Sequence, residues 1–137
     1  MALSPDMVAR HRVNQWLRSR PCLTSEEWFI RYWTPPAMPR ILPQALSNFA
    51  YERLHAYSGL EIGRVRPDDH LVDDLAFPAV CWFDWGLTLC EDFYDTFDID
   101  ISEHFDETQF FVFSDLIGFL EQQLESRKDE EMREIGG

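Results

Sequence analysis

Large apolar residues recur at every fourth position in the middle of the chain, within residues 84–97. They are Trp85, Leu89, Phe93 and Phe97. Because an α-helix turns once in about 3.6 residues, this spacing predicts a helix with all four side chains in one inward stripe. The acidic residues between them fall mainly on the other faces of that helix, toward water. We therefore expect a helix that buries an apolar stripe beneath an acidic outer surface.

The same reasoning predicts three more helices in the second part of the chain. The first covers residues 44–58 and ends at Gly59, because glycine favours helix C-termini. A short helix is expected over residues 102–106, and a last helix begins at Ser114, whose side chain is suited to capping. Residues 60–83 then form a long loop that leads into the acidic helix.

Two shorter helices are expected near the N-terminus. Ser4 and Pro5 have the pattern of an N-cap followed by proline in the first turn of a helix that runs to about residue 18. Thr24 and Glu27 have the spacing of a capping box, and the helix that follows is dense in aromatic rings. Such a density of rings requires burial, either in the protein's own core or against a partner.

A proline-rich segment follows these two helices. Residues 34–43 contain four prolines, which exclude the interior of a helix and favour an extended connector. We expect Met38, Ile41 and Leu42 to pack against the helices. A proline-rich ligand for another domain is the alternative interpretation of this segment.

The predicted helices make the fold class all-α, and the composition is ample for a core, because 45% of the 137 residues are hydrophobic and 15% are aromatic. We divide the chain into an N-terminal helical and proline-rich extension over residues 1–43, a helical bundle over 44–126 and a charged, flexible tail over 127–137. No run approaches the roughly 18 apolar residues that a membrane span needs, and the N-terminus lacks an apolar signal segment. We therefore expect a cytoplasmic protein.

Charge is distributed unevenly along the chain, whose formal net charge is −13. Residues 1–66 hold nine Arg and five acidic residues, whereas residues 67–137 hold twenty acidic and three basic residues. An acidic surface repels the phosphates of nucleic acid and suits a basic protein surface. We therefore expect a basic protein partner and no nucleic acid. Alternatively, the Arg-rich half packs on the acidic half within one molecule.

The sequence shows no pattern typical of catalysis or metal binding. Its three cysteines lack C-x-x-C spacing, so they predict free thiols rather than a disulfide framework or a zinc site. The alternating polar residues from Asp98 onward are similar to a calcium loop, but Glu103 replaces its glycine and Gln109 replaces its last glutamate. The four histidines accompany no nucleophile motif. We expect no enzymatic activity, no cofactor and no metal.

Three short motifs together resemble the acyl carrier protein family. They are DHLVDDL at residues 69–75, FDIDI at 97–101 and SDLIGFL at 114–120. Each motif is weakly specific by itself, and the resemblance rests on their order and spacing over about residues 46–124. It implies an acyl-carrier-like four-helix bundle, preceded here by an N-terminal helical extension. It also implies that the acidic second helix docks on Arg and Lys patches of partner proteins.

The chain departs from that family where its members carry phosphopantetheine on a serine. This position falls on Phe83, and no serine lies between Ser58 and Ser102. We therefore expect a non-enzymatic, carrier-like protein without phosphopantetheine that binds a basic partner through its second helix. The expected partner-binding residues are four carboxylates and three aromatic rings: Asp84, Glu91, Asp92, Asp95, Trp82, Phe83 and Trp85. The alternatives are a functional specialised acyl carrier modified at another residue, and a small ligand- or metal-binding domain.

Overall fold

Helices make up most of the chain, as the apolar spacing predicts. The structure is a computed structural model that describes residues 4–136, without the side chains of residues 129 and 131–136. Its α-helices are α1 (Met7–Leu17), α2 (Ser25–Tyr32), α3 (Gln44–Ser58), α4 (Phe77–Val80), α5 (Trp85–Phe97) and α6 (Phe113–Gly136), and its short 3-10 helices are η1 (Ile62–Arg64) and η2 (Glu107–Gln109). The described residues form no strand beyond one isolated bridge between His70 and Val112. The all-α prediction is confirmed.

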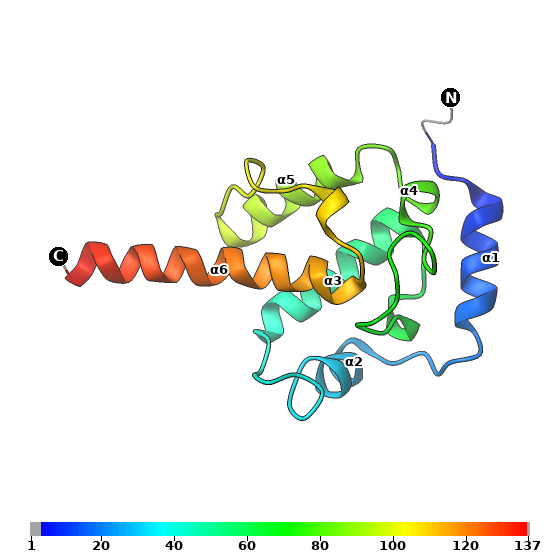
Figure 1. Cartoon of the computed structure of the whole chain (residues 1–137), viewed down its shortest axis with the longest axis horizontal. Helices are drawn as coiled ribbons and strands as arrows, with labels where there is room; N and C mark the ends of the chain where they lie inside the picture. Colours follow the sequence, from blue (N-terminus) through cyan, green and yellow to red (C-terminus); the bar gives the residue numbers. More distant parts are fainter. Residues whose placement is uncertain (1–3, 137) are drawn as a thin grey trace.

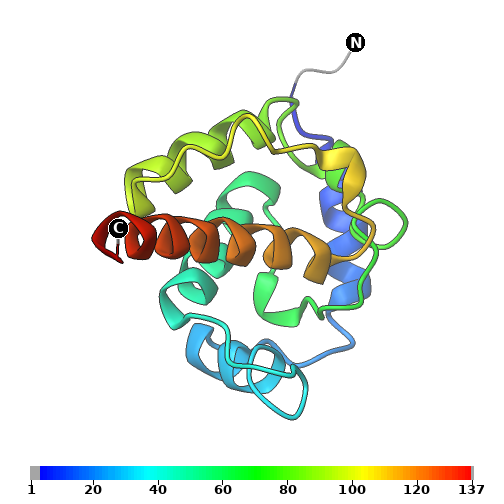
Figure 2. The same ribbon diagram turned by 60° about the vertical axis from the view of Figure 1, so that its left-hand side comes forward.

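The helices are arranged around α6, the longest of them. Figures 1 and 2 show α3 behind α6, with α5 along one side of α6 and α2 on the other. Helix α1 stands at the end of the molecule opposite the C-terminus, next to α4 (Figure 1). The second half of α6 extends beyond the other helices and includes most of the predicted tail. A helical backbone does not test whether a segment is flexible, so the flexibility of the tail stays a prediction. Residue 137 lies outside the described residues.

Several predicted helix ends agree with the structure. The hydroxyl of Thr24 accepts a hydrogen bond from the backbone N–H of Glu27, and the Glu27 carboxylate accepts one from the backbone N–H of Thr24. Gly59 ends α3 in the left-handed region, with φ at 68°. The predicted cap of the first helix is wrong, since the carboxylate of Asp6, not Ser4, accepts bonds from the first turn of α1. Ser114 lies inside α6 and does not precede it.

The short helix predicted over residues 102–106 is also wrong. Residues 102–104 form a turn, and η2 follows it. The carboxylate of Asp100 accepts hydrogen bonds from both the backbone N–H and the hydroxyl of Ser102. A side chain that binds nearby backbone in this way competes with helix formation. The residues between α5 and α6 are therefore a connector with two tight turns.

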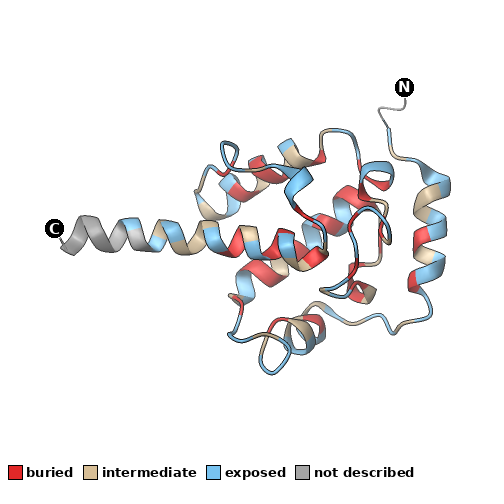
Figure 3. Ribbon diagram, viewed as in Figure 1, coloured by how far each residue is buried: buried red, intermediate tan, exposed pale blue. Residues whose placement is uncertain are grey.

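One hydrophobic core joins the predicted extension to the predicted bundle. Trp28 and Trp33 of the extension are fully buried, and both rings pack against Phe113 at the start of α6. The dense aromatic rings are thus buried mainly in the protein's own core. Leu42 of the proline-rich segment joins the same core, whereas Ile41 is exposed, contrary to expectation. Figure 3 shows buried residues on the inward faces of all the longer helices.

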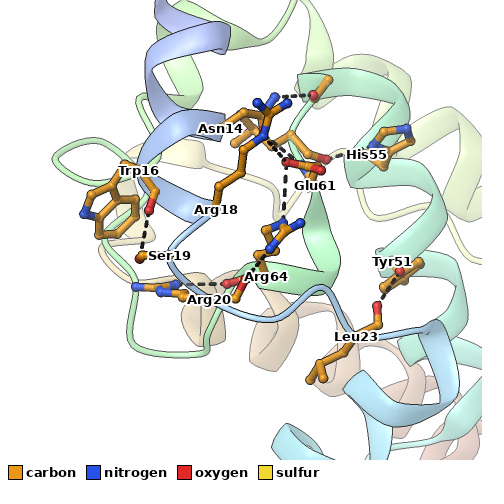
Figure 4. Close-up of polar contacts among 12 residues, drawn as sticks. Asn14, Trp16, Arg18, Ser19, Arg20, Leu23, Tyr51, His55, Glu61 and Arg64 are labelled. Carbon is orange, nitrogen blue, oxygen red and sulfur yellow. Dashed lines mark hydrogen bonds and ion pairs between the residues drawn. The ribbon is translucent and has the colours of Figure 1, made fainter.

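Polar contacts fasten the N-terminal helix to the rest of the chain (Figure 4). The Asn14 side chain donates to the carbonyl of Gly59 and accepts from the backbone N–H of Glu61. The guanidinium of Arg64 donates to the carbonyl of Arg20. These contacts hold α1 and the segment after it against η1, so the Arg-rich half is part of the folded body.

Ion pairs between the two halves of the sequence agree with the alternative drawn from the charge distribution. Arg20 pairs with Asp69, and Arg40 pairs with two carboxylates on α6. Arg53 on α3 lies 3.8 Å from the carboxylate of Asp92 on α5. Part of the positive charge is therefore neutralised within the molecule.

Candidate functional site

Helix α5 has two apolar faces rather than one. The inward face is the predicted stripe, in which Trp85, Leu89 and Phe93 are buried and Phe97 is partly buried. A second stripe, spaced by four, three and four residues, consists of Phe83 just before the helix and Leu87, Cys90 and Tyr94 within it; Cys90 is buried, and the other three side chains face outward. Phe83, Leu87 and Tyr94 are exposed by 66%, 67% and 52%. Because the inward face packs against the core, the exposed side chains of the outward stripe are available to contact another molecule.

A groove runs between this outward stripe and the connector that follows α5. It consists of two adjoining depressions of about 380 Å³ and 420 Å³, and Leu87, Cys90 and Ser102 line both. Phe83 lies at one end and Tyr94 at the other. We call this feature the α5 groove, with residues 83–95 as one wall and 100–108 as the other.

The ring of Phe105 brings the connector close to α5. It packs edge-on against the inward-facing Trp85, with ring centroids 5.7 Å apart. A side chain at Gly86 would block this approach, because its Cβ would lie 2.7 Å from a carbon of the Phe105 ring. Gly86 therefore permits the close contact that forms one end of the groove.

Carboxylates surround the apolar parts of the α5 groove. Six acidic residues line its two depressions: Asp84, Glu91, Asp95, Asp100, Asp106 and Glu107. No Arg, Lys or His lines either of these depressions. Hydrogen bonds from Ser102 and Thr108 lower the pKa values of Asp100 and Asp106, so these two carboxylates stay ionised well below neutral pH. The groove is an apolar surface in a negative field.

The structure separates the predicted carboxylates into two groups. Glu91 and Asp95 are exposed at the rim of the groove, and Asp84 lines it while partly buried. Asp92 instead points toward α3, where its carboxylate accepts a hydrogen bond from the hydroxyl of Tyr57. Asp92 therefore holds two helices together.

The predicted aromatic residues are also divided. Phe83 is exposed in the groove, and Trp82 is half exposed beside it but lines neither depression. Trp85 is only 5% exposed and packs against Phe77 and Phe105. The expectation that Trp85 contacts a partner is therefore corrected, because its ring lies in the core. There it helps to position α5.

Sequence reasoning missed Leu87, Cys90 and Tyr94 as parts of one surface. Their helical spacing is visible in the sequence, but the inward stripe of larger side chains is the stronger signal. Phe105 gave no local signal, because its role depends on a contact with another part of the chain.

Neither buried cysteine has the properties of a reactive nucleophile. Burial raises the pKa of the Cys81 thiol to about 12. Burial, with the nearby Asp100 and Glu91, also raises the pKa of Cys90 at the floor of the groove. The thiolate is the reactive form, so both side chains are unreactive near neutral pH. Within the described part of the chain, no three His, Cys, Asp or Glu side chains come together in a way that suits a metal ion.

A larger depression of about 930 Å³ lies beside the start of α6. Its lining is mainly polar, and the only Arg among its lining residues, Arg40, is paired with Glu121 and Glu125. Because these charges are already paired and the depression is wide, it offers less to a partner than the α5 groove does.

Comparison with known proteins identifies no relative. No family model, curated protein or solved structure matches this chain. None of the described helices combines the length and the apolar composition that crossing a bilayer requires. The α5 groove and its surroundings are therefore the features of the molecule that bear on its function.

Proposed function

We propose that this chain is a non-enzymatic, carrier-like protein that binds a basic protein partner through the α5 groove. The observation that carries this proposal is the outward stripe, in which Phe83, Leu87 and Tyr94 are exposed, with six carboxylates and no basic residue lining the groove around it. Large exposed apolar side chains mark interaction surfaces, and complementary charge speeds and orients association. Arg and Lys on a partner would meet the carboxylates while its apolar groups cover the stripe.

The order of the long helices supports an acyl-carrier-like arrangement. Along the chain, α3, α5 and α6 follow one another in the order that the resemblance implies for the first, second and fourth helices of a four-helix bundle. The turns of the connector stand in place of the third helix. We propose that the bundle is a carrier-type scaffold, to which α1 and α2 add an N-terminal part that shares its core.

The position expected for the prosthetic group supports a role without cargo. Phe83 stands just before α5, and its ring is exposed in the groove. A phenyl ring has no oxygen with which to form the phosphodiester that phosphopantetheine requires. The surface from which an arm would otherwise extend is instead an apolar contact surface.

Charge reversal tests the docking proposal. The double variant Glu91→Arg and Asp95→Arg changes two exposed rim carboxylates, whereas Glu52→Arg and Glu130→Arg changes two exposed carboxylates on α3 and α6 by the same total charge. In capture experiments from the native host, we expect the wild type and the control variant to retain the same partner, and the rim variant to lose it. Equal capture by all three proteins would contradict docking through this rim.

Intact-mass measurement tests the absence of cargo. The chain is co-expressed with a phosphopantetheinyl transferase, next to an authentic carrier protein as a positive control. We expect the carrier to gain the mass of the arm and this chain to keep its unmodified mass. A gain in mass would instead favour the specialised carrier, and a Ser102→Ala variant would then show whether the hydroxyl that lines the groove had been modified.

A further inference from the structure

We infer that the α5 groove receives an amphipathic α-helix of the partner, with apolar residues along one side and Lys or Arg beside them. This inference rests on the proposed function and specifies the class of partner. Within α5 the outward stripe rises for about 10 Å from Leu87 to Tyr94, at about 1.5 Å per residue, and Phe83 extends it just before the helix begins. The helical part of the stripe therefore matches about two turns of a second helix, and Phe83 adds a contact beyond them.

The spacing of the stripe favours a helix as the occupant. Leu87, Cys90 and Tyr94 are three and four residues apart on α5, which is the spacing of the rows along which helices pack ridges into grooves, and Phe83 continues this row just before the helix begins. A partner helix with apolar residues at i, i+4, i+7 and i+11 presents a matching row. Its central side chains would lie over Leu87 and Cys90, where the two depressions adjoin.

The backbone of the connector argues against an extended peptide. Strand addition requires a row of free N–H and C=O groups at a sheet edge. The described residues contain no strand, and the N–H groups of His104, Phe105 and Gln109 already donate to backbone carbonyls within the connector. Recognition in this groove therefore depends on side chains.

The negative charge of the α5 groove favours a basic partner helix over a second copy of this chain. Two copies meeting through their α5 grooves would bring six carboxylates against six, with no basic residue on either lining. Like charges at close range oppose association, and opposite charges favour it. A helix that carries Lys or Arg on either side of its apolar row removes this repulsion.

Three synthetic peptides of roughly fifteen residues test the inference. The first has Leu at i, i+4, i+7 and i+11 with Lys beside them and Ala elsewhere. The second has the same composition in an order that spreads Leu around the helix, and the third has Glu in place of Lys. Binding is measured by fluorescence anisotropy and mapped by backbone amide shifts. We expect the first to bind at least about tenfold more tightly than the others, with shifts in residues 83–108.

A substitution in the stripe separates apolar contact from simple attraction. Leu87→Glu removes an exposed anchor and adds a carboxylate, so pure charge attraction would tighten binding of the first peptide. We expect it to weaken binding at least about tenfold. Ile30→Glu, at an exposed apolar residue on α2, is the matched control and leaves binding unchanged. Circular dichroism establishes that both variants are folded.

The outcomes distinguish this inference from the proposed function. Equal binding of the first two peptides, both tighter than the third, would overturn the helical occupant while leaving docking of a basic partner in place. Shifts outside the groove would also overturn the inference. If neither Lys peptide bound more tightly than the Glu peptide, both the inference and the proposed function would fail.

Discussion

The hydroxyl of Tyr57 on α3 donates a hydrogen bond to the carboxylate of Asp92 on α5, and this bond joins the two helices. Burial, together with this bond, raises the pKa of Tyr57 well above its usual range, so the phenol stays a neutral donor. A guanidinium nitrogen of Arg53 lies 3.8 Å from the same carboxylate oxygen. One of the four carboxylates expected to dock a partner therefore stabilises the fold.

Substitution of neighbouring acidic residues distinguishes these two roles. We expect Asp92→Ala to lower the free energy of unfolding by about 1–3 kcal/mol, because it leaves the Tyr57 hydroxyl without an acceptor. Glu91→Ala, at an exposed position, changes it by less than about 0.5 kcal/mol. Urea denaturation measures both. A double-mutant cycle with Tyr57→Phe checks the assignment, since additive effects would show that the pair contributes nothing.

The ion pair between Arg20 and Asp69 links the two halves of the sequence. Both side chains are largely buried, and two hydrogen bonds of 2.7 Å and 2.9 Å join them. We expect Asp69→Ala to destabilise the protein by about 3–5 kcal/mol, because it leaves a buried guanidinium unpaired. Arg18→Ala breaks an exposed pair with Glu61 and costs less than about 1 kcal/mol. Similar losses for the two variants in chemical denaturation would contradict this ranking.

The sequence predicts most helices well because their signals are local. The stripe from Trp85 to Phe97 and the capping box at Thr24 are contained within single elements, and both are observed. The capping of α1 by Asp6 rather than by Ser4 is different, because local sequence does not decide it. Both side chains are suitable caps, and the tertiary contact from the backbone N–H of Asp6 to the carbonyl of Ala79 marks where α1 is held.

The candidate site is harder to predict because it combines distant residues. The sequence gives equal weight to Glu91 and Asp92, and only the position of Tyr57, 35 residues earlier, shows that Asp92 is engaged within the molecule. Likewise, the approach of Phe105 to Gly86 is invisible to local pattern. Predictions from helical spacing thus identify α5 but not the second wall of its groove.

The capping box of α2 gives a prediction for stability and for pH. We expect Thr24→Ala to cost about 1 kcal/mol, because it removes the acceptor for the N–H of Glu27. Hydrogen bonds with Thr24 lower the pKa of Glu27. Its stabilising effect is therefore present above the pKa of the unfolded chain and is lost as pH falls through the lower folded pKa. Thermal denaturation of Glu27→Gln and wild type from neutral to acid pH measures this, and parallel curves would contradict it.

Two glycines on different helices give a matched pair of substitutions. A Cβ at Gly118 on α6 has no neighbour within 4 Å, so Gly118→Ala is expected to stabilise the protein by about 0.5–1 kcal/mol. A Cβ at Gly86 meets the Phe105 ring, so Gly86→Ala should be less stable than Gly118→Ala by about 1–3 kcal/mol. Differential scanning calorimetry compares them. Equal stabilisation by both would show that the ring moves aside without cost.

Alkaline pH should destabilise the fold through Cys81. Burial raises its pKa from 9.0 to about 12, so between these values the unfolded chain releases a proton that the folded chain retains. Stability therefore falls as pH rises through this window, by up to about 1.4 kcal/mol per pH unit. In denaturant titrations from pH 8 to 11, we expect Cys81→Ala to show a shallower decline than the wild type. The comparison uses the slopes of the free energy of unfolding against pH, because the substitution also removes buried atoms and so changes the absolute stability. Identical slopes would contradict this assignment.

The unpartnered stripe on α5 also bears on how copies of the protein behave in solution. At neutral pH the carboxylates around Phe83, Leu87 and Tyr94 keep neighbouring molecules apart. As the medium is acidified toward the sequence pI of about 4.5, the net negative charge of the protein falls and this mutual repulsion weakens, so the exposed apolar side chains can associate. The acidic groups thus keep copies of the protein dispersed through charge repulsion. Light scattering should show that the protein clusters reversibly on acidification and that Leu87→Glu reduces this clustering.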